Sequence, residues 1–240
     1  IINSRIIWRF ILFFLTIAVL FFVLKSDFFK IKFIQCSKEE NLCSNAEIDL
    51  FNNLYDKNIF FINGKEMVKK SKFKNIALKE IQIKRQLPNK LIIYLKSRKP
   101  AVLLKTGINE FLVDEAGFVF EEVKQKNYDL PIIIFKDQVA ALGTEGDEKI
   151  IKLIQLSHAL QELFIPFNDL VFEDKNYITA NAANFLAIFS LEKDGFNQVV
   201  SLQMILQSSK IRNTEDVKFK ESRIPKIDLR FDKPIISFND

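Results

Sequence analysis

Histidine, cysteine and glycine are scarce in this chain of 240 residues, which holds one His, two Cys and 6 Gly. No G-x-S-x-G, H-E-x-x-H or phosphate-binding loop occurs, so the common hydrolase, metalloprotease and nucleotide-binding motifs are missing. His158 has no recurrent Ser, Cys or carboxylate motif to pair with, and we expect it on the surface. Two cysteines without a nearby histidine do not favour a zinc site. We therefore expect no catalytic residue, metal, cofactor or small-molecule substrate.

The chain also lacks low-complexity linkers, repeats of fixed period and runs of basic residues. Its net charge is +5, but Lys and Arg are spread along the sequence. This spacing indicates solvated faces and not a nucleic-acid-binding surface. Phenylalanine, by contrast, is abundant, with 25 residues.

One long apolar run stands near the start of the sequence. Phe10–Leu24 reads FILFFLTIAVLFFVL and holds no charge. With the residues back to Ile6 it reaches roughly the 20 residues that span a bilayer. Arg9 at the edge can extend to the headgroups, beside an interfacial Trp8. We predict a transmembrane helix over residues 6–25 and a cytoplasmic tail over 1–5, truncated because the chain begins with Ile1 and not Met. The predicted anchor residues are Trp8, Phe10, Leu12, Phe14, Leu20, Phe22 and Leu24.

Two alternatives to a membrane anchor stay open. A cleaved signal peptide would end in small residues, whereas Lys25–Phe29 is bulky. A buried core helix would show a polar face, and none is visible over four turns. The flanking charges do not decide the orientation, because basic residues lie on both sides of the run. They are Arg5 and Arg9 before it and Lys25, Lys30 and Lys32 after it.

Cys36 and Cys43 are the only cysteines and lie close together just after the anchor. A local disulfide would suit an oxidising compartment, while two free thiols are the alternative. The disulfide would place the soluble part outside the cell membrane.

Residues 28–99 predict a first soluble unit. Phe29, Ile31 and Phe33 alternate with lysines, which is typical of a strand. Ser44 and Glu47 have capping-box spacing and open a predicted helix over 45–55, and a second cap stands at 63–66. Two strands follow, at 81–87 and 91–95. The order strand, helix, helix, strand, strand can bury a modest core.

Residues 100–240 predict a second unit, with Pro100 at the boundary. Asp114 lies in a hairpin loop, where a turn role is favoured over a catalytic one. Asn213–Ser222 is polar and predicts an exposed loop. Predicted strands are 111–113, 118–120, 132–135, 170–173, 177–179, 185–191, 227–231 and 235–238, and predicted helices are Asp147–Phe164 and Phe196–Ile211. The fold class is α+β, with this larger mixed domain dominated by an antiparallel sheet.

The sequences of several segments resemble those of the FtsQ/DivIB family of bacterial cell-division proteins. The motifs are KNIFFING, IQIKRQLP, KLIIYLKSRKP, FLVDEAGFVF, IDLRF and KPII, in that order behind the apolar run. The resemblance implies one membrane helix, a POTRA domain over 28–99 and a β-domain over 100–240. It also implies a single-pass type II protein of the inner cell membrane, with its soluble part outside and enriched at the septum. The cysteine pair departs from the family pattern and suggests a divergent lineage.

The resemblance implies a non-enzymatic scaffold that links early division proteins to septal peptidoglycan synthesis through FtsB- and FtsL-like partners. These partners dock near the C-terminal strands in this family. A final strand at a sheet edge can receive a partner's strand, and Pro234 tolerates an edge position. Alternatives are a POTRA-bearing secretion or membrane-protein assembly component and a membrane-anchored hydrolase. The predicted partner-binding residues are Ile227, Asp228, Leu229, Arg230, Phe231, Ile235, Ile236 and Phe238.

Overall fold

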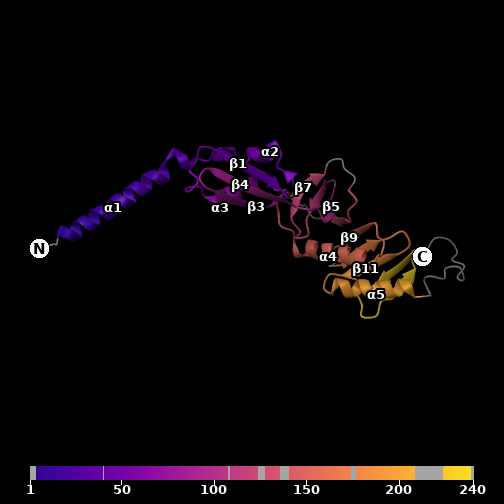
Figure 1. The fold of residues 1–240 in the computed structure, drawn as a ribbon. Coiled ribbons are helices and arrows are strands. Elements are labelled where there is room, and N and C mark those ends of the chain that lie inside the picture. The colour runs from indigo at the N-terminus through magenta and orange to yellow at the C-terminus, as the bar shows by residue number, and fades with distance from the viewer. Residues whose placement is uncertain are drawn as a thin grey trace. The chain divides into compact units, whose positions relative to one another are not determined.

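A computed structural model describes residues 4–39, 41–107, 109–123, 128–135, 141–173, 177–208 and 224–238 (Figure 1). The chain divides into two compact units, Ile1–Arg98 and Lys99–Asp240. Each unit has its own sheet and its own hydrophobic core. The predicted α+β class with an N-terminal apolar helix is confirmed.

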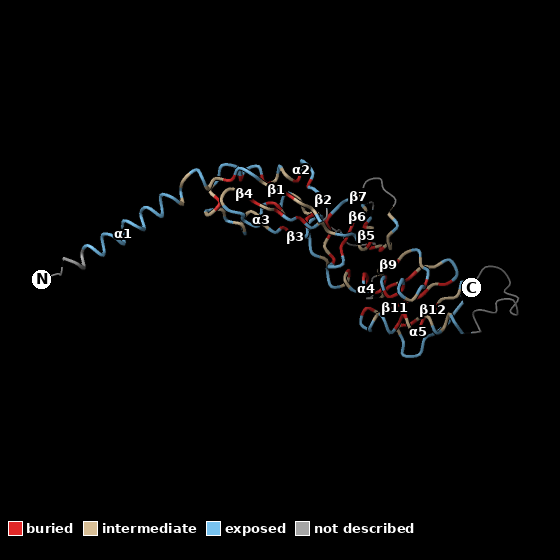
Figure 2. The backbone as a smooth tube through the Cα atoms, viewed as in Figure 1, coloured by how far each residue is buried: buried red, intermediate tan, exposed pale blue. Residues whose placement is uncertain are grey.

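The apolar run forms one continuous helix, α1 (Ser4–Lys25). Its segment Trp8–Lys25 is long and apolar enough to cross a membrane, and α1 is the one such helix among the described residues. None of this segment is buried inside the protein, so the helix is pale blue along almost all its length in Figure 2. Its apolar surface is therefore available to lipid.

The first unit contains a four-stranded sheet in the order β2-β1-β4-β3. β1 runs parallel to β4, and the other two pairings are antiparallel. Ile31, Phe51, Leu91 and Ile93 are among its fully buried residues. The elements are η1 (Asp27–Phe29), β1 (Phe33–Lys38), β2 (Asn41–Leu42), α2 (Asn45–Asp49), η2 (Asn52–Leu54), α3 (Gly64–Lys74), β3 (Leu78–Gln86) and β4 (Lys90–Ser97).

The strand expected at Phe29–Phe33 is wrong. Phe29 ends the short helix η1, and β1 begins only at Phe33. The backbone of this segment bonds to a different partner: Ile31 N donates to Lys57 O, and Ile59 N donates to Phe29 O. These bonds to residues 57–59 replace a sheet ladder, while the alternating pattern still buries Ile31.

The capping box is confirmed, but the helix after it is shorter than expected. The Glu47 carboxylate accepts from both Ser44 N and Ser44 Oγ, each at 2.9 Å. α2 ends at Asp49, where the Asn52 side chain donates to the Asp49 carboxylate at 2.7 Å. Asn52 and Asn53 are also weak helix formers, and only the short η2 follows. The second cap is confirmed as well, since Asn63 accepts from Glu66 N at 3.3 Å at the start of α3.

The second unit contains a nine-stranded open sheet in the order β13-β12-β11-β10-β9-β8-β5-β6-β7. Five of its pairings are antiparallel, and β5–β8, β8–β9 and β11–β12 are parallel. α4 and α5 make the crossovers β8–β9 and β11–β12, and they pack against each other and the core. The elements are β5 (Val102–Thr106), β6 (Asn109–Val113), β7 (Val119–Val123), β8 (Ile132–Phe135), α4 (Glu148–Glu162), β9 (Asp169–Glu173), β10 (Tyr177–Asn181), β11 (Leu186–Ser190), α5 (Gly195–Gln207), β12 (Pro225–Asp228) and β13 (Ile235–Phe238).

Most predicted elements of this unit have a counterpart, with two differences at helix ends. α4 ends at Glu162, so Phe164, which we placed inside the helix, lies beyond it at a φ of 55° and is exposed. The backbone turns there because Pro166 cannot continue a helix. α5 ends at Gln207, and the loop predicted at 213–222 lies outside the described residues.

Asp114 has the predicted turn role. Its carboxylate accepts from Ala116 N and Phe118 N, each at 3.0 Å, and Gly117 takes a φ of 79° in the same turn. His158 is exposed on α4, also as expected.

Candidate docking edge

Each open sheet ends in two edge strands, which point part of their backbone N–H and C=O groups away from the sheet. The edges are β2 and β3 in the first unit and β7 and β13 in the second. These four strands are the places where the described chain could accept a strand from another protein.

Three of the edges carry features that discourage strand addition. β2 is only two residues long. β3 exposes a mainly charged row that includes Lys79, Glu80 and Lys84. β7 exposes two glutamates, and its first residue, Val119, already exchanges backbone bonds with residues 143 and 144. Charges, short length and covering loops are the usual protections of an edge.

β13 differs because its sequence Ile-Ile-Ser-Phe holds no charge and all four residues are exposed. Ile235 and Ile236 are 51% and 44% exposed, although both are large apolar residues. The strand pairs with β12 on one side in an antiparallel register, with Ile227 opposite Ile236. Among the described residues it pairs with no strand on its other side.

Two of the predicted partner-binding residues are not accessible. Ile227 and Leu229 are buried in the core of the second unit. The strand expected at Ile227–Phe231 is also displaced, since β12 begins at Pro225 and ends at Asp228. Leu229 N then donates to Ile188 O at 2.8 Å, so the chain stays attached to β11 through one more bond. These two residues hold the edge in place and do not offer side chains to a partner.

Asp228 and Arg230 form an ion pair with each other beside the edge strand. Arg230 Nη2 lies 2.6 Å from Asp228 Oδ2, and Arg230 Nε and the Arg230 backbone N both donate to Oδ1, at 2.9 and 3.1 Å. Burial raises the pKa of Asp228, but the hydrogen bonds from Arg230 outweigh it and hold the pKa below its ordinary value. The guanidinium also lies 5.0 Å from the Tyr177 ring on β10. The pair therefore fixes the corner after β12.

The remaining predicted residues, Phe231, Ile235, Ile236 and Phe238, are exposed. Phe231 also lines a hollow of about 300 Å³ between this corner and the start of α5. The α5 side of the hollow could not be predicted from the sequence, because its residues lie about 30 positions or more before the corner. Together with Leu229, Asp232 and Pro234, the lining includes Lys193, Asp194, Asn197, Gln198 and Ser201.

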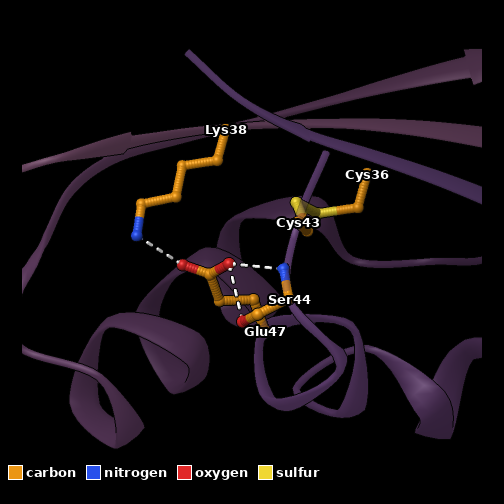
Figure 3. The surroundings of a disulfide bond; sticks show 5 residues. All are labelled: Cys36, Lys38, Cys43, Ser44 and Glu47. Atoms are coloured by element: carbon orange, nitrogen blue, oxygen red, sulfur yellow. Dashed lines mark hydrogen bonds and ion pairs between the residues drawn. A yellow bond between two sulfur atoms is a disulfide. The ribbon is translucent and has the colours of Figure 1, made fainter. Parts of the chain in front are cut away.

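Cys36 and Cys43 are joined by a disulfide that links β1 to the residue after β2 (Figure 3). Both residues are buried, and the Glu47 carboxylate lies nearby with Lys38 Nζ at 2.7 Å. Burial raises the pKa of Glu47, but bonds from Lys38 and Ser44 outweigh it, so the pKa lies below its ordinary value. The disulfide therefore closes the hairpin against the capped start of α2. No group of three or more His, Cys, Asp or Glu side chains that could hold a metal occurs in the described part of the chain.

The predicted anchor residues all lie on α1. Six of them are exposed on the helix surface: Trp8, Phe10, Leu12, Phe14, Leu20 and Phe22. Leu24 is partly covered, and its carbonyl accepts a bond of 2.6 Å from the Asn58 side chain.

No family model matches the chain. Individual proteins do match, and each is named "Cell division protein DivIB". The chain is 25% identical to the protein of Clostridium acetobutylicum over 213 residues, which is 82% of each sequence. It is 25% identical to that of Clostridium tetani over 126 residues, 47% of each sequence. It is 30% identical to that of Clostridium botulinum over 102 residues, 42% of this chain and 40% of the relative. The match thus spans less than half of two of these relatives and most of the third.

Proposed function

We propose, from the chain's relationship to the DivIB cell-division proteins, that it acts in cell division as a membrane-anchored docking protein and not as an enzyme. The similarity over 82% of the chain to one such protein supports the cell-division role. α1 supports a single-pass anchor. The soluble units would lie outside the cytoplasmic membrane, at the septum, which the buried Cys36–Cys43 disulfide favours.

The observation that carries the docking proposal is the uncharged, exposed edge strand β13. A partner segment that adds a strand there would gain backbone hydrogen bonds, and its alternate side chains would contact Ile235 and Ile236. The hollow beside Phe231 lies next to the same corner and would take one partner side chain. Ile227 and Leu229 beneath the edge keep it in a fixed position.

The proposed occupants are FtsB- and FtsL-like bitopic proteins, which the family resemblance implies. Binding of these partners would connect early division proteins to septal peptidoglycan synthesis. No transformation of a substrate is needed for this role, because positioning alone brings the synthetic proteins to the site of division.

The test replaces one exposed residue of β13. Ile236→Lys places a charge on the edge strand, while the side chain stays in solvent. Natural proteins use charged residues on edge strands in this way to prevent strand addition. We expect the full-length variant in detergent to bind the soluble segment of the organism's FtsB-like protein at least 10-fold more weakly in a pull-down titration. A truncation before Asp228 is less suitable, because it removes the core residue Leu229.

Gln82→Lys is the matched control, because it adds the same charge to the exposed edge strand β3 of the first unit. It should leave binding unchanged. Circular dichroism should give the same spectrum for both variants and the parent chain. Unchanged affinity of Ile236→Lys would reject β13 as the docking edge.

A further inference from the structure

Four large apolar side chains are exposed at the end of the first unit that joins α1. They come from three separate segments, and each is between 58% and 63% exposed. We call these four residues, together with the lysines in residues 25–33 and 56–61, the proximal collar. Its apolar members are Phe28, Phe33, Phe61 and Leu87.

Hydrogen bonds from the Asn58 side chain and from the backbone place Phe28 and Phe61 next to the end of α1. Asn58 Nδ2 donates to Leu24 O at 2.6 Å, and Phe61 N donates to Asn58 O at 3.1 Å. The bond from Ile59 N to Phe29 O keeps the same two segments together. Phe28 packs on Phe29 and Phe29 on Phe60, with ring centroids 5.1 and 5.0 Å apart. Both exposed rings therefore lie within a few residues of the last turn of α1.

The register of the sheet places Phe33 and Leu87 at the same end. Lys32 N and Phe33 N both donate to Asn89 O, in the turn between β3 and β4. Leu87 belongs to that turn. The opposite end of these strands is marked by the pairing of Leu78 with Ser97.

The collar is also basic. Residues 25–33 and 56–61 contain Lys25, Lys30, Lys32 and Lys57 against Asp27 and Asp56, a net charge of 4 − 2 = +2. Exposed aromatic rings among lysines are the combination by which proteins lie in the interface of an anionic membrane.

We propose that the proximal collar is a lipid-binding surface. Its apolar side chains insert at the boundary of headgroups and acyl chains in the leaflet where α1 ends, and its lysines contact anionic headgroups. Continuity with the anchor selects lipid as the occupant, because a bilayer that holds α1 reaches Leu24, to which the collar is hydrogen-bonded. The inference rests on the proposed anchoring by α1 and is independent of docking at β13.

The experiment places a single tryptophan in the collar of the full chain. Trp8, the one native tryptophan, is changed to Phe, and Phe61→Trp is added. The protein is reconstituted into vesicles of phosphatidylcholine and phosphatidylglycerol, with or without bromine atoms on the upper acyl chain. We expect the brominated lipid to remove at least half of the tryptophan emission.

Two matched variants make the result specific. Phe73→Trp lies in the last turn of α3, near the Leu78–Ser97 end, and is 87% exposed, so its emission should be unaffected. Leu20→Trp lies within α1 and should be quenched by bromine deeper in the chain. Quenching of Leu20→Trp without quenching of Phe61→Trp would overturn the collar and leave the anchoring intact. Absence of quenching at Leu20→Trp would overturn the anchoring and the collar with it.

Lipid composition tests the role of the lysines. Vesicles of phosphatidylcholine alone should quench Phe61→Trp less than half as strongly as the anionic vesicles. Equal quenching in both would overturn the contribution of the lysines. A Phe61→Trp emission that bromine leaves unchanged but that shifts with protein density would indicate self-association instead and reject lipid as the occupant.

Discussion

Asp228 and Arg230 show how single side chains stabilise the corner after β12. The carboxylate is largely buried and accepts three hydrogen bonds of 3.1 Å or less from one arginine. Since the pKa of Asp228 is lowered in the folded protein, the unfolded chain binds a proton more readily at this residue. The stabilisation is therefore complete above the ordinary carboxyl pKa of about 4 and is lost as the pH falls through the folded pKa.

The corresponding prediction concerns Asp228→Asn. At pH 7 this change should destabilise the second unit by about 1 kcal/mol. That corresponds to a fall of about 3 °C in the unfolding midpoint for a unit of this size. At pH 3, below the ordinary carboxyl pKa, the difference should be smaller. Thermal unfolding of the full chain in detergent, followed by circular dichroism, measures both values. Asp27→Asn is the control, because the Asp27–Lys30 pair is exposed and should contribute no measurable stability. An equal difference at pH 7 and pH 3 would contradict the assigned cause.

At the scale of elements, the β6–β7 turn contacts the segment before α4 backbone to backbone. A Cβ atom added to Gly146 would lie 2.9 Å from the Gly117 Cα and carbonyl carbon, and nearer still to the carbonyl oxygen. These neighbours are main-chain atoms and cannot rotate away. The contact joins the Asp114 turn to the start of α4 and so keeps two parts of the second unit in register.

Gly146→Ala should therefore lower the stability of the second unit by about 1–3 kcal/mol. Gly64→Ala is the matched substitution in α3, where nothing lies within 4 Å of the added atom. There, alanine should raise stability by about 0.5 kcal/mol, because it reduces the freedom of the unfolded chain. Thermal midpoints of both full-length variants measure the two effects. Similar midpoints for both would mean that residue 146 tolerates a side chain.

Local signals in the sequence predict much of this fold, whereas the sequence pattern does not reveal which distant segments pair with each other. The caps at Ser44 and Asn63 depend on neighbouring residues and are confirmed. The Phe29–Phe33 strand is wrong because its bonding partner, residues 57–59, is nearly 30 positions away. Alternation also located the last two strands approximately, but it could not distinguish buried Ile227 from exposed Ile236, since the core that covers one of them comes from other elements.

For the whole molecule, the disulfide gives a test of which side of the membrane holds the soluble units. A compartment outside the cytosol keeps a buried disulfide oxidised, whereas the cytosol keeps thiols reduced. We expect the full chain, acid-quenched from intact cells, to gain two polyethylene-glycol maleimide groups only after reduction.

Cys43→Ser serves as the control for this labelling. It leaves Cys36 without its disulfide partner, so it should gain one group without any reductant. Two groups on the parent chain without reduction would contradict the proposed extracytoplasmic location.

The uncharged edge strand β13 has a consequence for the expression level of the protein. An uncharged edge strand that can accept a partner's strand can also pair with other exposed edge strands, including β13 of a second copy of this chain. If a partner docks at β13 as proposed, a cell that made this chain in excess over that partner would hold copies with an unoccupied edge in one membrane, and these copies would tend to aggregate. Matched expression of this chain and its proposed partner would prevent this aggregation. Co-production with the partner should therefore raise the yield of dispersed protein.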